Sequence, residues 1–166
     1  MTLRAREMLL LRLARLRIIR RHFGPLATWL DAILLDMTGC RISLIGRPRI
    51  PMLVLTTTGR RTNRPRRVAL VYHDEGGAWY VVGSNWGKPE PPQWALNLLE
   101  KPRACVKTRV WSGFIKAVVL GEDARQDIWP RLLETMPAWK SSRTARTFLV
   151  FALLREAESA SLPTGP

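Results

Sequence analysis

The chain is poor in the residues from which many enzymes build their sites. Its 166 residues include only two cysteines, two histidines and two tyrosines. Cys40 and Cys105 belong to no CxxC pair and no Cys/His cluster, so no metal site is expected. We expect both thiols to be reduced, as in a cytoplasmic protein. His22 and His73 leave a Ser-His-Asp site or a histidine metal site with few candidates.

Nucleotide-binding fingerprints and long apolar runs are also missing. The sequence has no GxGxxG, no GxxxxGK[ST] and no alternating strand and helix order, which disfavours a Rossmann or P-loop site. The apolar segment 26–35 is too short for a membrane span of about 20 residues, and it contains Asp31. Residues 1–21 are no secretory signal, because arginine interrupts every candidate apolar core.

Acidic residues are scarce, with 13 Asp and Glu against 27 Lys and Arg and a net charge of +14. Such a surface attracts nucleic acid, anionic lipid or anionic cofactors, but it does not indicate a fold. The apolar fraction of 46% and the seven tryptophans predict a folded globule, and the length suits one domain.

The N-terminal residues 1–40 are predicted to be helical. Residues 2–22 read as a helix with seven arginines against Glu7, and 26–37 resume a helical pattern after Gly24-Pro25. Three interpretations of 2–22 stay open: a helix packed on the domain, a peripheral contact with an anionic membrane surface, or a nucleic-acid arm.

Residues 41–156 are predicted to form an α+β domain with a mainly β core. Period-2 patterns predict six strands at 52–58, 66–73, 78–84, 103–109, 111–120 and 146–154, with helices at 93–101 and 123–136. The strands follow one another through hairpin signals, so an antiparallel sheet that closes into a barrel is expected. Residues 157–166 are small and polar and are predicted to be a disordered tail.

The densest cationic feature follows the first predicted strand. The strand ends in three threonines, Gly59 turns the chain, and five arginines follow at positions 60, 61, 64, 66 and 67. No acidic residue lies between Asp36 and Asp74. Guanidinium groups form strong paired hydrogen bonds with carboxylate and phosphate, so this stretch is suited to a large polyanion.

Three segments at matching separations resemble one known family. LTTTGRRTNRPRRVAL, WYVVGSNWG and PPQWALNLLEKPRACV are similar to motifs of the deazaflavin-dependent nitroreductases, a branch of the flavin/deazaflavin oxidoreductases. The similarity covers residues 52–110 and continues more weakly to Leu154. It implies a split β-barrel, like that of FMN-binding proteins, and the cofactor F420, with FMN as an alternative. A homodimer is also compatible with it.

The resemblance assigns candidate roles by motif position. The implied cofactor contacts are Arg60, Arg61 and Thr62 at the phosphate and tail; Arg66, Arg67, Val68, Ala69, Leu70 and Val71 along the second strand; Val82, Gly83, Ser84 and Asn85 at the deazaflavin ring; and Gln93, Trp94, Ala95, Leu96 and Asn97 on the short helix. Ser84 is the candidate polar group at the reacting ring, unless it simply caps the strand end.

The implied function is hydride transfer from reduced F420 to an electron-poor small molecule, such as an enone, a quinone-like compound or a nitro compound. The chain departs from the family pattern at Asn85, Trp86 and Ala95. In the late segment, Trp139 stands as the candidate substrate wall where family members offer tyrosines.

Two other hypotheses stay open. One is a non-catalytic split-barrel protein that binds deazaflavin, FMN or lipid, located in the cytoplasm and peripheral to the inner face of the cell membrane. The other is nucleic-acid binding from charge alone. The sequence offers no recognisable arrangement of aromatic platforms for the latter, so a specific nucleic-acid partner is not expected.

Overall fold

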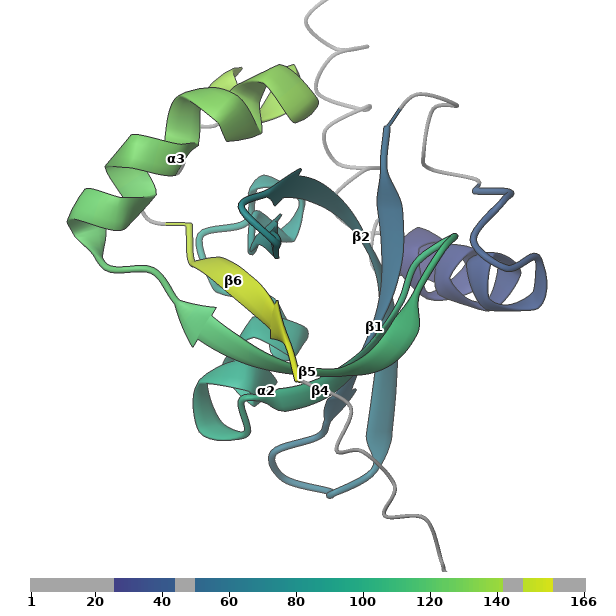
Figure 1. Cartoon of the computed structure of the whole chain (residues 1–166). Helices are drawn as coiled ribbons and strands as arrows, with labels where there is room; N and C mark the ends of the chain where they lie inside the picture. The colour runs from purple at the N-terminus through teal and green to yellow at the C-terminus, as the bar shows by residue number, and fades with distance from the viewer. Residues whose placement is uncertain (1–25, 44–49, 142–147, 157–166) are drawn as a thin grey trace, which may run out of the picture.

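The computed structural model describes residues 26–43, 50–141 and 148–156. Its centre is a closed antiparallel barrel with the strand order β1-β2-β3-β6-β5-β4 (Figure 1). The strands are β1 Met52–Thr58, β2 Pro65–Glu75, β3 Ala78–Val82, β4 Arg103–Lys107, β5 Ser112–Val119 and β6 Val150–Arg155. The expected six-strand barrel with flanking helices is confirmed.

Strand alternation divides the apolar residues between the barrel interior and its outer surface. On β1, Leu53 and Leu55 enter the main core, while Val54 belongs to an outer cluster. A side-chain period of two along each strand produces this division. The main core also takes in Trp94 and Leu98 from α2 (Gln93–Glu100), so this helix contributes its apolar side to the barrel interior.

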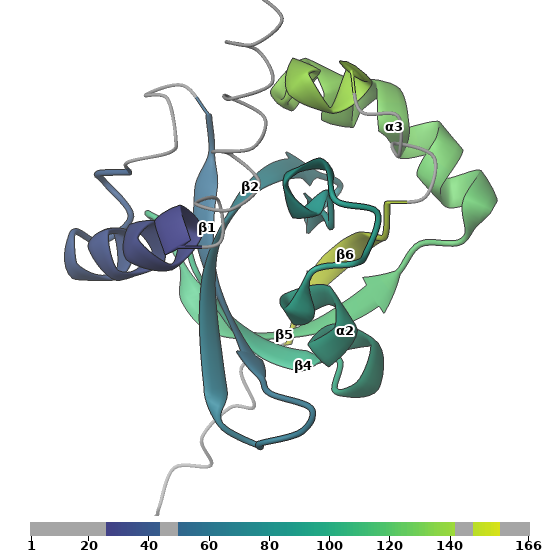
Figure 2. The same cartoon turned by 180° about the vertical axis from the view of Figure 1, so that it is seen from behind.

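Two helices cover the outer surface, and Figures 1 and 2 show them on opposite sides of the barrel. Residues 26–37 form one of them, and Ala32 and Leu35 pack with Val54 and Ala69. The other is α3 (Glu122–Thr135), whose Ile128 and Leu132 lie in a cluster with Val82, Trp139, Phe148 and Val150.

Asp36 fastens helix 26–37 to two strands. Its carboxylate accepts hydrogen bonds from Lys107 Nζ on β4 at 2.7 Å and from Arg67 Nη1 on β2 at 3.0 Å. These two cations hold the pKa of Asp36 below its usual range, with the hydrogen bond from Lys107 as the larger cause. The helix is therefore held by charge as well as by apolar packing.

Some boundaries differ from the sequence predictions. The strand expected at 78–84 ends at Val82, because Ser84 turns into the short 3₁₀ helix η1 (Asn85–Gly87). A second 3₁₀ helix, η2 (Pro137–Ser141), was not expected. The helix predicted at 2–22 and the tail at 157–166 lie outside the described residues. Within the described part, none of the helices is long and apolar enough to span a bilayer.

Candidate cofactor site

A tight turn between β1 and β2, here called the arginine turn (residues 59–65), presents the cationic cluster. The Gly59 N–H donates to the Arg64 carbonyl at 2.9 Å, and the Asn63 N–H donates to the Gly59 carbonyl at 2.8 Å. A Cβ at position 59 would lie 2.9 Å from Thr62 Oγ1 and 3.1 Å from the Arg64 oxygen. A Cβ at this position would therefore require the Thr62 side chain and the Arg64 carbonyl to shift, so the tight turn favours glycine.

One buried amide joins this turn to α2. Asn97 is only 4% exposed, and its Oδ1 accepts from the Arg60 backbone N–H at 3.1 Å and from Arg60 Nη1 at 3.4 Å. Asn97 Nδ2 donates to Thr57 Oγ1 at 3.0 Å. The Thr57 hydroxyl in turn approaches the Arg66 carbonyl at 3.5 Å. Asn97 thus connects the end of β1, the arginine turn and the start of β2.

The five arginines divide into two groups. Arg60 donates to Gln93 Oε1 at 2.9 Å, and Arg67 is paired with Asp36. Arg61, Arg64 and Arg66 are exposed, and no carboxylate among the described residues pairs with them. The Arg60 guanidinium donates to the neutral amide oxygens of Gln93 and Asn97, and no ion pair joins it to a carboxylate in the described part of the chain. Four arginines in and beside this turn are therefore without an acidic partner among the described residues, and such groups are suited to binding an anion.

The strand β2 presents two different faces along the predicted contact residues. Val68 and Leu70 are half-buried and pack against the barrel core. Ala69 lies in the outer cluster under helix 26–37, and Val71 packs toward α3. Along the outer face of β2, Ala69 therefore contacts the cluster of helix 26–37 and Val71 contacts the cluster of α3. Arg67 precedes both on the same face.

The segment Val82–Asn85, here called the ring-side motif after its predicted role, begins at the last residue of β3. Its backbone is conformationally constrained. Gly83 donates to the Leu149 carbonyl at 2.8 Å, and a Cβ there would lie 3.4 Å from Pro92 Cδ. Asn85 and Trp86 both have left-handed backbones, with φ of 41° and 57°. Such angles are unusual for non-glycine residues and commonly mark functional sites.

Ser84 and Asn85 differ in how free their side chains are. Ser84 precedes η1, but its hydroxyl makes no capping hydrogen bond to that helix. The Asn85 side chain instead donates from Nδ2 to the Glu90 carbonyl at 2.8 Å and so closes the loop before α2. Ser84 is therefore the better placed of the two to hydrogen-bond a ligand.

A family model described as F420H(2)-dependent quinone reductase matches residues 37–155. The chain belongs to this family. The expected family relationship is thereby confirmed, and the matched region takes in the whole barrel, the arginine turn and both helices α2 and α3.

Individual relatives agree with this assignment. An F420H(2)-dependent quinone reductase of Mycobacterium tuberculosis (strain ATCC 25618 / H37Rv) is 36% identical over 88 residues, which cover 52% of this chain and 58% of that protein. A solved F420H2-dependent reductase, FDR-A, superposes with a TM-score of 0.57 at 27% identity, covering 62% of this chain and 93% of the other. A domain-swapped dimer gives a TM-score of 0.59 at 27% identity, over 73% and 90% of the two chains.

The predicted cofactor contacts on α2 of this quinone reductase family member differ in how far they are buried. Gln93 is exposed beside Arg60, whereas Trp94 and Ala95 are buried in the main core, where the Trp94 ring lies 5.7 Å from Phe151. Leu96 is half-buried on the same helix. The helix α2 thus brings polar residues to the arginine turn and apolar residues to the barrel interior.

Trp139 lies in the second core cluster, which also contains Val82 from the ring-side motif. It is 8% exposed, so it supports the motif from inside more than it presents a free surface. Its proposed role as a substrate wall is therefore restricted to a small exposed edge.

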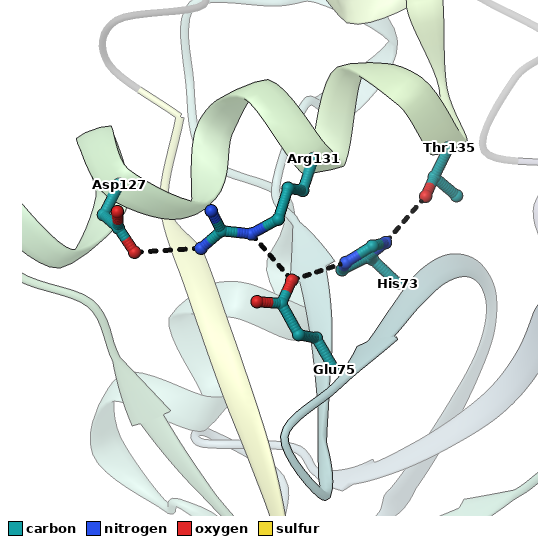
Figure 3. A network of polar contacts seen from close by, with 5 residues as sticks. All are labelled: His73, Glu75, Asp127, Arg131 and Thr135. Atoms are coloured by element: carbon teal, nitrogen blue, oxygen red, sulfur yellow. Dashed lines mark hydrogen bonds and ion pairs between the residues drawn. The ribbon is translucent and has the colours of Figure 1, made fainter.

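A polar network between β2 and α3 was missed by sequence reasoning (Figure 3). The His73 ring lies between Thr135 Oγ1 at 2.9 Å and Glu75 Oε2 at 3.0 Å. The same Glu75 oxygen accepts from Arg131 Nε at 2.7 Å, and Arg131 Nη2 donates to Asp127 at 2.9 Å. The available signals were the His-x-Glu spacing on one strand face and the Asp127–Arg131 pair one helical turn apart.

This network perturbs the charged groups it contains. The hydrogen bond from His73 is the largest cause that lowers the pKa of Glu75, and Arg131 adds to it. The hydrogen bond to Asp127 is the largest cause that raises the pKa of Arg131. The network holds the C-terminal part of α3 against the C-terminal end of β2. It thereby helps to position the second core cluster.

Proposed function

We propose that this protein binds reduced F420 and reduces a quinone-like acceptor. The observation that carries the proposal is the arginine turn: it presents uncompensated guanidinium groups and is fixed by Asn97, in a chain of the F420H2-dependent quinone reductase family. F420 has a phosphate and a glutamate tail, and a row of cations at a rigid turn fits that chemistry.

Different residues are proposed to bind the tail, the phosphate and the ring of F420. Arg61, Arg64 and Arg66 hold the acidic tail, while Arg60 holds the phosphate from a position set by Gln93 and Asn97. The backbone of β2 and the Val82–Asn85 segment hold the ring, with the Ser84 hydroxyl as its hydrogen-bonding partner. When bound, the reduced deazaflavin supplies a hydride.

The acceptor is proposed to be quinone-like because of the family, with enones and nitro compounds as further candidates. The two tyrosines are not assigned to the acceptor side, because each is half-buried and packs against a core cluster. Tyr72 packs against the barrel core with its ring 6.1 Å from Trp79, and burial is the largest cause that raises its pKa. Tyr80 packs against the second core cluster beneath α3. The proton for the reduced acceptor is therefore assigned to solvent, which delivers it directly or through the Ser84 hydroxyl.

The test is a titration of purified protein with oxidised and reduced F420, followed by tryptophan and cofactor fluorescence, with FMN in parallel. Saturable F420 binding at micromolar concentration supports the proposal, and the absence of binding at that concentration refutes it. Anaerobic addition of menadione to the reduced complex then measures cofactor reoxidation.

A second candidate is a protein that binds F420 or FMN without catalysis. The observation that favours it is the placement of both tyrosines in packed clusters. Tight F420 binding with no reoxidation by menadione, an enone or a nitroarene supports this alternative. Reoxidation well above the rate without protein excludes it.

A further inference from the structure

Trp86 has an unusual backbone conformation for a tryptophan. Its φ is 57°, and it lies between Asn85, with a φ of 41°, and Gly87, with a φ of 80°. Consecutive left-handed residues are uncommon, because any side chain other than that of glycine is crowded by the backbone in this region. A bulky residue keeps such a conformation only where the surrounding structure fixes it, and residues of this kind cluster at binding sites.

Hydrogen bonds fix the turn that carries Trp86. The Gly87 N–H donates to the Ser84 carbonyl at 2.7 Å, which closes the turn around Trp86. The Asn85 side chain donates to the Glu90 carbonyl at 2.8 Å and so holds the rest of the loop. The backbone beneath the indole is therefore held in one conformation, next to Ser84.

The Trp86 indole is half-buried but does not belong to the apolar core. Within the described ranges, it is a member of none of the three core clusters and makes no contact with another aromatic ring. The barrel is therefore filled without this ring. The tryptophans that do pack in or against a core cluster are Trp79, Trp94, Trp111, Trp129 and Trp139.

The N–H group of the indole is open to a ligand. No hydrogen bond joins Trp86 Nε1 to any residue that the structure describes, and no buried side-chain nitrogen or oxygen there lacks a partner. Nε1 therefore reaches solvent. A Cβ added at Gly87 would meet no atom within 4 Å, so the tip of the turn is not packed against the rest of the barrel. A ligand beside this turn meets both an electron-rich ring face and a hydrogen-bond donor.

Trp86 directly follows the ring-side motif. Two peptide units separate it from Ser84, so their Cα atoms lie within about 7.6 Å of each other. The tail, the phosphate and the ring of F420 already have proposed contacts, whereas the acceptor lacks an aromatic wall. Both tyrosines pack against core clusters, and Trp139 is only 8% exposed. The indole of Trp86 is therefore the aromatic group best placed for the acceptor.

We propose that Trp86 forms the acceptor-binding wall of the site, an inference that rests on the proposed F420 function. A flat, electron-poor aromatic acceptor stacks on the indole face, and Nε1–H donates to an acceptor oxygen such as a quinone carbonyl. The left-handed turn holds the indole next to the segment that binds the deazaflavin ring. Trp86 is thus a residue for acceptor binding and not for cofactor binding.

The test is isothermal titration calorimetry with menadione on the full chain saturated with oxidised F420, so that binding is measured without turnover. Trp86→Gly removes the ring at a position where glycine adopts the backbone without strain. Trp86→Phe keeps an aromatic face. The matched control is Phe114→Ala, which removes a ring of 49% exposure from the outer face of β5.

Trp86→Gly is expected to raise the menadione dissociation constant about tenfold, as for the loss of one aromatic contact and one hydrogen bond. Trp86→Phe is expected to retain most of the affinity, and Phe114→Ala all of it. The F420 dissociation constant is expected to change less than about twofold in all three variants. The melting temperature of Trp86→Gly is expected to be no lower than that of wild type, because glycine relieves the left-handed strain.

The outcomes separate this inference from the proposed function. Failure of F420 to bind refutes the proposed function and the inference with it. If F420 binds, the inference alone is overturned by wild type without saturable menadione binding, or by equal menadione affinity of wild type and Trp86→Gly. Weaker F420 binding by Trp86→Gly identifies the indole as a cofactor contact and also overturns it. A lower melting temperature with unchanged menadione affinity shows that the indole serves only in packing.

Discussion

Asn97 is the single residue that most directly fixes the shape of the arginine turn. Its amide serves Arg60 on one side and Thr57 on the other, from a position that is almost fully buried. An amide with both ends occupied specifies one orientation of the helix relative to the turn, because neither partner can be exchanged without leaving a buried polar group unpaired.

Replacing Asn97 by Ala is expected to destabilise the fold by about 1–3 kcal/mol, since Thr57 and the Arg60 N–H lose their buried partner. It is also expected to weaken F420 binding, because the turn is no longer held. Denaturant unfolding and the fluorescence titration measure the two effects. The control is Gln93→Ala, an exposed change expected to alter stability by less than about 0.5 kcal/mol. Equal losses of stability for both substitutions would argue against a special structural role for Asn97.

The open arginines lead to a prediction about affinity without loss of stability. Arg61→Ala combined with Arg64→Ala is expected to raise the F420 dissociation constant about tenfold or more and to reduce its salt dependence, because charge-assisted hydrogen bonds contribute about 1.5–3 kcal/mol. Arg109→Ala, an exposed cation in the β4–β5 turn, is the control and is expected to leave the constant unchanged. An unchanged constant in the double variant would place the tail elsewhere.

At the scale of elements, α3 is attached to β2 by the network of His73, Glu75 and Arg131. The pKa of Glu75 is lowered in the folded state, so its ionised form stabilises the protein above the ordinary carboxyl pKa of about 4.5. That contribution is lost as the pH falls through the lowered folded-state value. The attachment of α3 is therefore expected to weaken in acid.

The corresponding experiment compares Glu75→Gln with Glu134→Gln, where Glu134 is an exposed residue on α3. The free energy of unfolding is measured from pH 7 down to about pH 3, an interval that includes the titration of ordinary carboxyl groups. Wild type and Glu134→Gln are expected to lose stability in parallel, whereas Glu75→Gln shows a shallower loss. Identical pH slopes for all three proteins would show that Glu75 contributes nothing through its charge.

The elements show how far local sequence patterns determine structure. The first strand was predicted at 52–58, as observed, because alternation and the glycine turn are both local signals. The strand after it runs two residues further, to Glu75, where the Gly76-Gly77 turn begins. The ion pairs of Asp36 with Arg67 and Lys107 could not be predicted, because they join three residues that are distant in sequence.

The candidate site, like the fold, could be predicted in its local features but not in its distant contacts. Its motifs named Arg60 and Asn97 separately, but their contact depends on how α2 packs across the barrel, which no local pattern records. Likewise, the motif implies that Val68 and Leu70 lie along the second strand beside the cofactor, but it does not show that both half-buried side chains pack against the core. Motif position predicts which segments lie near the cofactor, whereas packing determines the direction of each side chain.

At the scale of the whole molecule, the barrel closes through its last strand. β6 pairs with β3 on one side and with β5 on the other, and its Phe151 and Leu153 lie in the main core. A chain ending at residue 149 is expected to lose the native fold, because two strand edges open and the core loses both side chains. A chain ending at residue 156 keeps the Arg103–Glu156 pair and is expected to melt like the full chain. Circular dichroism at rising temperature distinguishes the two.

The position of β6 also has a consequence for synthesis. A ribosome releases residues 150–155 after the other five strands, so β3 and β5 have no common partner until all five have emerged. The β1–β2 and β4–β5 pairs each join strands that are neighbours in the chain, and both are complete before that moment. The nascent chain is therefore expected to form these two hairpins first, while β3 and β5 still have unpaired edges, and to close the barrel only when β6 arrives.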